Sequence, residues 1–189
     1  MRVISGKKRG LKLISVPNSN VRPTLDRIKE NLFNLIGLEI EDKVFVDLFG
    51  GFGGIGIEAY SRGAKVYISE ISKENFKIIL ENLEKLNTDE IKAYNLDYKE
   101  LIQKLNYLNV KADYIYLDPP YTFTKEEYEE IILNILLKDI LKTDGTIIVE
   151  TEKNLDSINE FSEKIQEKLD MVDHRKYGRN SLIFMQKKG

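Results

Sequence analysis

Between residues 44 and 151 the chain alternates short hydrophobic runs with stretches whose apolar residues recur at helical spacing. Runs typical of buried strands lie at 44–48, 65–70, 91–95, 113–117 and 146–150. Amphipathic stretches follow most of these runs. Parallel strands need a long crossover connection, which is usually a helix, so the alternation predicts βαβ units. We therefore expect an α/β fold built on a doubly wound, mostly parallel sheet.

The C-terminal part is expected to close this sheet. One helix is predicted to carry Ile158, Phe161, Ile165 and Leu169, whose spacing is helical. Residues 171–177 and 181–186 then predict an antiparallel strand pair around a turn at 178–180. With the five strands before them, the pair predicts a seven-stranded sheet.

The N-terminal 38 residues differ from the rest of the chain in charge. They hold eight basic and two acidic residues, a net charge of +6, which leaves −8 for the remainder of a chain with a net charge of −2. Short strands at 3–6 and 11–16 predict a β-hairpin with Lys7, Lys8 and Arg9 at its tip, and a helix is expected from Thr24 to Gly37. We predict a basic extension over 1–38 that meets a polyanion, ahead of a main domain over 39–189. A solvated basic segment without a partner is the alternative.

The amino-acid composition excludes several classes of protein and of functional site. The chain has no run of about 18 apolar residues, so no transmembrane helix is predicted. The basic N-terminus lacks the apolar stretch of a secretory signal. The absence of cysteine excludes disulfides and thiolate metal sites and fits a reducing cytoplasm. His174 is the only histidine, which disfavours a histidine-based metal or nucleophilic site. We expect a cytoplasmic monomer with no metal and no membrane contact.

A glycine-rich turn follows the first predicted strand. Gly51, Gly53 and Gly56 satisfy the pattern G-x-G-x-x-G, and Glu70 ends the next strand about 20 residues later, where dinucleotide-binding folds place a ribose-binding acid. A nicotinamide dinucleotide is therefore one candidate ligand. However, Asp47 ends the strand just before the glycines, where its carboxylate would repel a pyrophosphate and suit a cationic amino group.

A further acid follows the third predicted strand. Asp97 adds an acceptor where an adenine amino group would lie. A glycine-walled, acid-rich pocket fits a cofactor with an adenosine, a free ammonium and no phosphates, and S-adenosylmethionine is that molecule. Asp97 could instead, or also, cap the following helix. A tight turn with no ligand is disfavoured because surplus glycine is costly in a folded chain.

The fourth predicted strand stops at Asp118-Pro119-Pro120-Tyr121. Proline lacks an N–H group and has a fixed φ, so the pair cannot continue a central strand. The result is a rigid corner with a carboxylate on one side and an aromatic ring on the other. Open α/β sheets bind ligands at the carboxyl ends of their strands, which is where this corner lies. A plain strand-to-loop corner is the alternative.

With these motifs the chain resembles the Rossmann-like class I S-adenosylmethionine-dependent methyltransferases. More narrowly, it resembles the bacterial RsmD family, which methylates the exocyclic N2 of one guanine in small-subunit ribosomal RNA. The resemblance covers nearly the whole chain. The corner occurs in amino-methyltransferases of several substrates, whereas the N-terminal block is specific to this family. The residues on which the resemblance rests are 2–6, 9–10, 22–24, 26–27, Glu30, 33–34, 47–49 with the glycines, 56–59, 61–64, Glu70, 118–121 and 177–178.

Two positions depart from the family's pattern. The family usually has Ala or Cys where this chain has Gly50, and Ser where it has Phe52. Gly50 is a conservative change. Phe52 removes a small polar group from the cofactor loop and adds bulk.

The resemblance implies a role for each matching residue. Asp47 and the backbone of Gly51 and Gly53 would line the methionine part of the cofactor. Glu70 would accept both ribose hydroxyls, and Ile71 and Leu96 would sandwich the adenine, whose amino group Asp97 would bind. The Asp118 carboxylate and the Pro119 carbonyl would hold the target amine, with the geometry fixed by Pro119 and Pro120, while Tyr121 stacks on the base. RNA phosphates would be contacted by Lys7, Lys8, Arg9, Arg22 and Arg27.

Two other functions stay open at this point. An Asp-Pro-Pro-Tyr corner serves an adenine N6 amine equally well, so an adenine-N6 methyltransferase acting on DNA or RNA is the first alternative. An NAD-dependent oxidoreductase is the second. A silent RNA-binding module is hard to reconcile with Asp47, Glu70 and Asp118 all being present.

Overall fold

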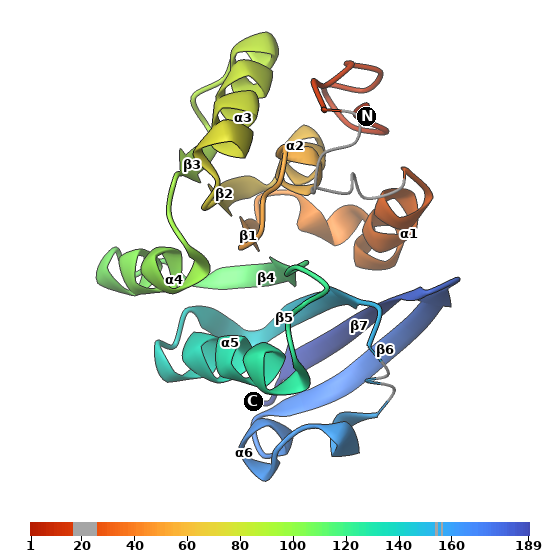
Figure 1. Cartoon of the computed structure of the whole chain (residues 1–189), viewed down its shortest axis with the longest axis vertical. Coiled ribbons are helices and arrows are strands. Elements are labelled where there is room, and N and C mark those ends of the chain that lie inside the picture. The colour runs from red at the N-terminus through yellow and green to blue at the C-terminus, as the bar shows by residue number, and fades with distance from the viewer. Residues whose placement is uncertain (17–25, 154, 156) are drawn as a thin grey trace. The chain divides into compact units, whose positions relative to one another are not determined.

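A computed structural model describes residues 1–16, 26–153, 155 and 157–189, and Figure 1 shows its helices and strands. The contacts divide the chain into two compact units, Met1–Asp97 and Tyr98–Gly189. The boundary predicted after residue 38 remains a prediction.

The first unit contains three parallel strands in the order β3-β2-β1. These are β1 (Val44–Asp47), β2 (Lys65–Ser69) and β3 (Lys92–Tyr94), joined by the helices α2 (Gly54–Ser61) and α3 (Lys73–Leu86). Ser72 caps α3 as predicted, since its side chain accepts a hydrogen bond from Asn75 N at 3.3 Å. Because the strands are parallel, their carboxyl ends lie at one edge of the sheet, where the glycine turn begins.

The predicted N-terminal helix is α1 (Asp26–Ile36), followed by the 3₁₀ turn η1 (Gly37–Ile40). Its apolar stripe, from Ile28 to Ile36, is buried as the spacing predicts. Gly37 has a φ of +69°, the left-handed conformation that commonly ends a helix. The expected cap, Thr24, lies outside the described residues.

The predicted N-terminal hairpin is present in a shortened form. Arg2 and Lys12 make an isolated antiparallel bridge, and Val3 N donates to Leu11 O at 3.0 Å. The ladder does not extend because Ile4 and Ser5 donate their backbone N–H groups to Glu58 of α2 rather than across the hairpin. The arm is therefore bound to the body of the unit.

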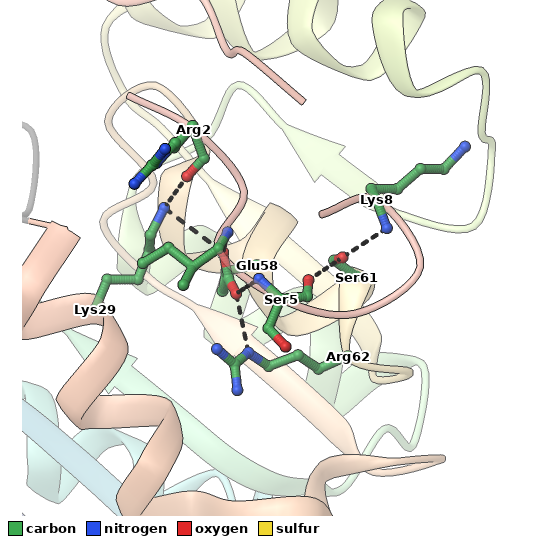
Figure 2. Close-up of polar contacts among 8 residues, drawn as sticks. Arg2, Ser5, Lys8, Lys29, Glu58, Ser61 and Arg62 are labelled. Atoms are coloured by element: carbon green, nitrogen blue, oxygen red, sulfur yellow. Dashed lines mark hydrogen bonds and ion pairs between the residues drawn. The ribbon is translucent and has the colours of Figure 1, made fainter. Parts of the chain in front are cut away.

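Glu58 is the centre of this attachment, and its side chain is 0% exposed. Its Oε2 accepts from Ile4 N at 2.7 Å and lies 3.6 Å from Lys29 Nζ, while its Oε1 accepts from Ser5 N at 3.0 Å and from Arg62 Nε at 2.9 Å. Figure 2 shows these groups converging on the carboxylate. Two cations and two amide donors compensate the burial of the charge.

Ser61 attaches the hairpin tip to the same helix (Figure 2). Its hydroxyl donates to Ser5 O at 2.5 Å and accepts from Lys8 N at 2.9 Å, and its carbonyl accepts from Lys7 N at 2.7 Å. A Cβ atom on Gly6 would lie 1.8 Å from Ser61 O, so only glycine permits this approach.

The second unit contains four strands in the order β4-β5-β7-β6. β4 (Ala112–Leu117) runs parallel to β5 (Leu141–Thr151), and β7 (Asn180–Lys187) pairs antiparallel with both β5 and β6 (Leu169–Tyr177). The helices of this unit are α4 (Tyr98–Tyr107), α5 (Lys125–Leu137) and α6 (Glu163–Gln166). Seven described strands, mostly parallel and closed by an antiparallel C-terminal pair, confirm the predicted α/β class.

One predicted boundary is wrong at β5. The fifth strand was predicted over 146–150, but the strand begins at Leu141 and runs through the turn-forming dipeptide Asp144-Gly145. Asp144 has a φ of +61°, and the β4–β5 register shifts where the dipeptide lies. The turn-forming pair therefore makes an irregularity within the strand.

The single helix predicted over 158–169 is also wrong. The chain instead forms the 3₁₀ turn η2 (Ile158–Glu160), the short helix α6 and then the start of β6 at Leu169. Phe161 has an extended backbone, with φ −96° and ψ 159°, which interrupts the helix. Phe161, Ile165 and Leu169 are buried all the same, so the apolar residues were identified correctly and their conformation was not.

We predict that Glu58→Ala lowers the free energy of unfolding by about 3–5 kcal/mol, because the substitution leaves Lys29 charged, buried and without its carboxylate. Urea denaturation measures this difference. The control is Glu81→Ala on the exposed face of α3, expected to change stability by less than about 0.5 kcal/mol. Equal effects of the two substitutions would contradict the assignment.

Candidate functional site

Asp47 ends β1 as a buried carboxylate. Phe49 N donates to its Oδ1 at 3.3 Å. Desolvation by burial raises the pKa of Asp47 to about 7, with a smaller rise from the nearby charge of Glu70 and an opposing effect of backbone hydrogen bonds from Phe49 and Gly56. A buried acid of this kind is stabilised in its charged form by a bound cation.

The turn after Asp47 needs its glycines for conformation and for space. Gly51 and Gly53 have φ values of +55° and +84°, and Gly53 is the N-cap of α2. Gly50 N donates to Ser69 O at 2.8 Å, which holds the turn against β2. A Cβ on Gly56 would lie 2.5 Å from Ile68 Cδ1, so glycine lets α2 pack closely on the strand. The pattern found in the sequence therefore corresponds to a tight strand-to-helix turn.

Glu70 follows β2 and faces this turn. Its Oε2 accepts from Gly51 N and its Oε1 from Ser72 N, both at 2.8 Å. Burial raises the pKa of Glu70, while these backbone hydrogen bonds lower it. The structure thus brings Asp47, the glycine turn and Glu70 together at the carboxyl ends of β1 and β2. Two neighbouring carboxylates make this part of the site suited to a cationic ligand.

Ile71, Leu96 and Asp97 lie at the ends of the neighbouring strands β2 and β3. Ile71 is 71% exposed although it is apolar, whereas Leu96 and Asp97 are half-buried. Asn95 joins the two strand ends, since its Nδ2 donates to Glu70 O at 2.7 Å and to Ile71 O at 3.1 Å. Asn95 was not predicted as a site residue, although its place as a polar residue at the end of a predicted strand could have indicated it.

Asn82 is a second residue that the sequence analysis missed. It lies in α3, is 0% exposed, and accepts from Ile14 N at 2.7 Å. Its Nδ2 donates to Ile14 O at 3.1 Å and to Phe52 O at 3.0 Å. The ring of Phe52, at the position that departs from the family pattern, is buried. Asn82 therefore ties the glycine turn to the N-terminal arm.

The Asp118–Tyr121 corner belongs to the second unit. It follows β4, with Asp118 half-buried, Pro119 buried and Tyr121 47% exposed. Phe123 N donates to Pro120 O at 2.9 Å, which closes a turn after the prolines. Thr124 then caps α5. The chain thus passes from β4 to a capped helix within a few residues.

A buried polar cluster lies beside this corner. The Tyr116 hydroxyl donates to Glu150 Oε2, and Asn180 Nδ2 donates to Glu150 Oε1 at 2.7 Å. Tyr128 of α5 is also buried, and its desolvation, with the nearby charges of Asp118 and Glu150, raises its pKa to about 12. Tyr128 is therefore a neutral hydroxyl at physiological pH. No sequence pattern pointed to these residues, because they come from four separate elements.

The predicted RNA-contacting residues differ in their surroundings. Lys7 Nζ lies 3.4 Å from Glu90 Oε2 and 3.8 Å from the centre of the Tyr60 ring, and Lys8 Nζ donates to Leu86 O at 2.8 Å. Arg9 and Arg27 are exposed. Arg22 lies outside the described residues.

None of the described helices has the length and apolar character needed to cross a membrane. Within the described residues, no group of three or more His, Asp or Glu side chains is arranged to hold a metal ion.

The chain is similar to one protein family and to several methyltransferases. Residues 1–186 match the family described as "Conserved hypothetical protein 95". The "Ribosomal RNA small subunit methyltransferase D" of Haemophilus influenzae is 34% identical over 82% of this chain and 80% of its own length. The "tRNA (guanine(10)-N2)-dimethyltransferase" of Methanocaldococcus jannaschii is 33% identical over 70% of this chain and 38% of its own. The solved "putative methyltransferase yhhF" from Escherichia coli covers 100% of this chain and 98% of its own, with a TM-score of 0.84 and 26% identity.

The raised pKa of Asp47 predicts a pH-dependent stability. Between its ordinary value of 3.8 and about 7 the native state binds more protons than the unfolded state, so the free energy of unfolding falls as pH rises through this window. Asp47→Asn removes this titration. We expect the variant to lose less stability than the wild type between pH 4 and pH 7 in urea denaturation. The exposed Asp89→Asn is the control and should follow the wild type; parallel curves for Asp47→Asn would contradict the prediction.

Proposed function

Because this chain belongs to the family described as "Conserved hypothetical protein 95", the RsmD family of methyltransferases, we propose that it transfers a methyl group from S-adenosylmethionine to the exocyclic N2 of a guanine in small-subunit ribosomal RNA. The relative named as a guanine-N2 methyltransferase supports this amine as the acceptor. Ribosomal RNA as substrate fits a cytoplasmic protein, and we propose that the chain acts as a monomer.

The observation that carries the proposal is the charge of the glycine turn. Asp47 and Glu70 are both acids with raised pKa values, so a cation is favoured there and an anion is disfavoured. S-adenosylmethionine carries an ammonium and a sulfonium, whereas a nicotinamide dinucleotide would bring a pyrophosphate to the same turn. This difference supports the methyl donor over the dinucleotide.

Each donor-site residue has a role that its surroundings support. Asp47 would hold the ammonium beside the backbone of Gly51 and Gly53. Glu70 already accepts two backbone hydrogen bonds, and the remaining lone pairs of its oxygens can accept from the ribose hydroxyls. The exposed side chain of Ile71 offers an apolar surface to the adenine, with Leu96 and Asp97 at the adjacent strand end. Bound S-adenosylmethionine supplies a methyl group already activated by its sulfonium.

Because the donor is activated, the chain's task at the acceptor is orientation. The lone pair of an exocyclic aromatic amine is delocalised into the ring, so the amine is a poor nucleophile. The Asp118 carboxylate and the Pro119 carbonyl would each accept one N–H of the amine and direct the lone pair at the methyl group. Positioning of this kind supplies up to about 7–11 kcal/mol of a barrier. The half-exposed ring of Tyr121 is available to stack on a base that has left its own stack.

The basic arm would contact phosphates of the RNA. Arg9 and Arg27 are exposed and available for such contacts. Lys7 lies beside Glu90 and Lys8 Nζ donates to Leu86 O, and their ammonium groups would contact phosphate next to these partners. Contacts of this kind make RNA affinity fall steeply with salt.

We predict that Asp118→Ala lowers the rate of methyl transfer at least about 100-fold, since the amine loses the acceptor that orients it. Calorimetry with S-adenosylhomocysteine should show unchanged binding, because the donor contacts are made by other residues. The control is Asp170→Ala, an exposed acid of β6, which should retain full activity. Loss of S-adenosylhomocysteine binding in Asp118→Ala would indicate a structural role instead.

Nucleoside analysis identifies the acceptor amine. Labelled methyl transfer to undermodified small ribosomal subunits should yield N2-methylguanosine as the only labelled nucleoside. N6-methyladenosine, or labelling of DNA in preference to RNA, would support the adenine-N6 alternative. A thermal shift with NAD and none with S-adenosylhomocysteine would support the oxidoreductase.

A further inference from the structure

The tip of the β6–β7 hairpin holds several basic residues and one tyrosine, to which no RNA contact has been assigned above. Residues 173–180 hold three cations, Arg175, Lys176 and Arg179, with a single acid, Asp173. Arg175 is paired to Asp173 at 2.9 Å. Arg179 is exposed in the turn and makes no hydrogen bond or ion pair with another described residue, and Lys176 is exposed beside it. The half-buried ring of Tyr177 lies between these two cations in the sequence.

Strand register places this tip at the edge of the second unit where the Asp118 corner lies. Leu117 pairs with Val149 in the parallel β4–β5 ladder, so both strands end on the same side. Thr151, the last residue of β5, pairs with Ser181 near the start of β7. The turn before β7 therefore projects beyond the carboxyl ends of β4 and β5 (Figure 1). Laterally, two strand spacings of about 10 Å in total separate β4 from β7.

The buried Glu150 cluster fixes the hairpin relative to the corner. Glu150 of β5 binds Tyr116, two residues before Asp118, and also Asn180, the first residue of β7. Tyr177 pairs with Asn180 across the hairpin, and directly paired residues of an antiparallel ladder have their side chains on the same face. Tyr177 thus lies on the face of the sheet that carries this cluster.

Preventing the edge strand from pairing with another chain explains only some of the basic residues at the tip. β6 is an edge strand, and charged side chains on such a strand discourage pairing with another chain. Arg179, however, lies in the turn, outside the ladder, where it blocks no pairing. Cations interleaved with an aromatic ring are instead the combination that binds single-stranded nucleic acid, through phosphate contacts and base stacking.

We propose that the β6–β7 tip, defined as Lys176, Tyr177 and Arg179, is a second RNA-binding surface, which holds the substrate strand next to the nucleotide presented to Asp118. This inference rests on the proposed function, because it takes ribosomal RNA as the substrate. Lys176 and Arg179 contact phosphates, and Tyr177 stacks on a base outside the catalytic corner. Both the tip and the N-terminal arm then bind the RNA.

The test compares two double variants of equal charge. Lys176→Ala with Arg179→Ala removes the tip cations, and Lys164→Ala with Lys168→Ala removes two exposed lysines near α6, at the other end of β6 (Figure 1). Affinity for a small-subunit RNA fragment is measured by filter binding over a range of salt concentrations. We expect the tip variant alone to bind more weakly, with a salt slope smaller by about 2, one for each lost phosphate contact. Tyr177→Ala should weaken binding without reducing the slope.

Kinetics and donor binding complete the test. In the tip variant the KM for RNA should rise while kcat and the affinity for S-adenosylhomocysteine stay at wild-type values. Equal weakening in both double variants, or none in either, overturns the inference even when the wild type methylates RNA. If the wild type transfers no methyl group to any RNA, but RNA affinity depends on the tip alone, the proposed reaction is wrong and the RNA-binding surface stands.

Discussion

The buried carboxylate of Glu58 joins the N-terminal arm to α2, the helix that begins at the glycine turn. It accepts hydrogen bonds from two backbone amides of the arm and lies against Lys29 and Arg62. Met1 packs over Gly54, the first residue of that helix. Asn82 adds a second link, between Ile14 and the carbonyl of Phe52. The described start of the arm is therefore part of the structure behind the donor turn, in addition to any contact it makes with RNA.

The turn itself combines two constraints that favour the same ligand. Its glycines permit the backbone conformation and the close packing of α2 on β2, and its acids are held in surroundings that disfavour their charge. A bound cation offsets part of the cost of burying a carboxylate. Donor binding at this turn is therefore expected to stabilise the first unit.

In the second unit a buried hydrogen-bond cluster around Glu150 supports the exposed corner. Tyr116 and Asn180 both donate to Glu150, so β4, β5 and β7 are joined at the end where the prolines redirect the chain. Pro119 and Pro120 restrict the backbone locally, and the cluster restricts the strand that precedes them. Such rigidity suits the amine-orienting role proposed for the corner, since a displacement of about 1 Å can cost roughly 100-fold in rate.

The sequence by itself determined the α/β class, the order of the main strands and helices, the glycine turn and the proline corner. These features depend on local periodicity and on residues with special backbone properties, which are visible without tertiary contacts. Local patterns did not predict the backbone conformation at Phe161 and Leu169, because an apolar residue can be buried in a helix or in an extended segment. They also did not predict that the turn-forming pair at Asp144 lies inside a strand. Only the tertiary structure decided the roles of Glu58, Asn82, Asn95 and Glu150. Each of these residues bonds to partners distant in the chain, and burial in the folded state is what makes those bonds necessary.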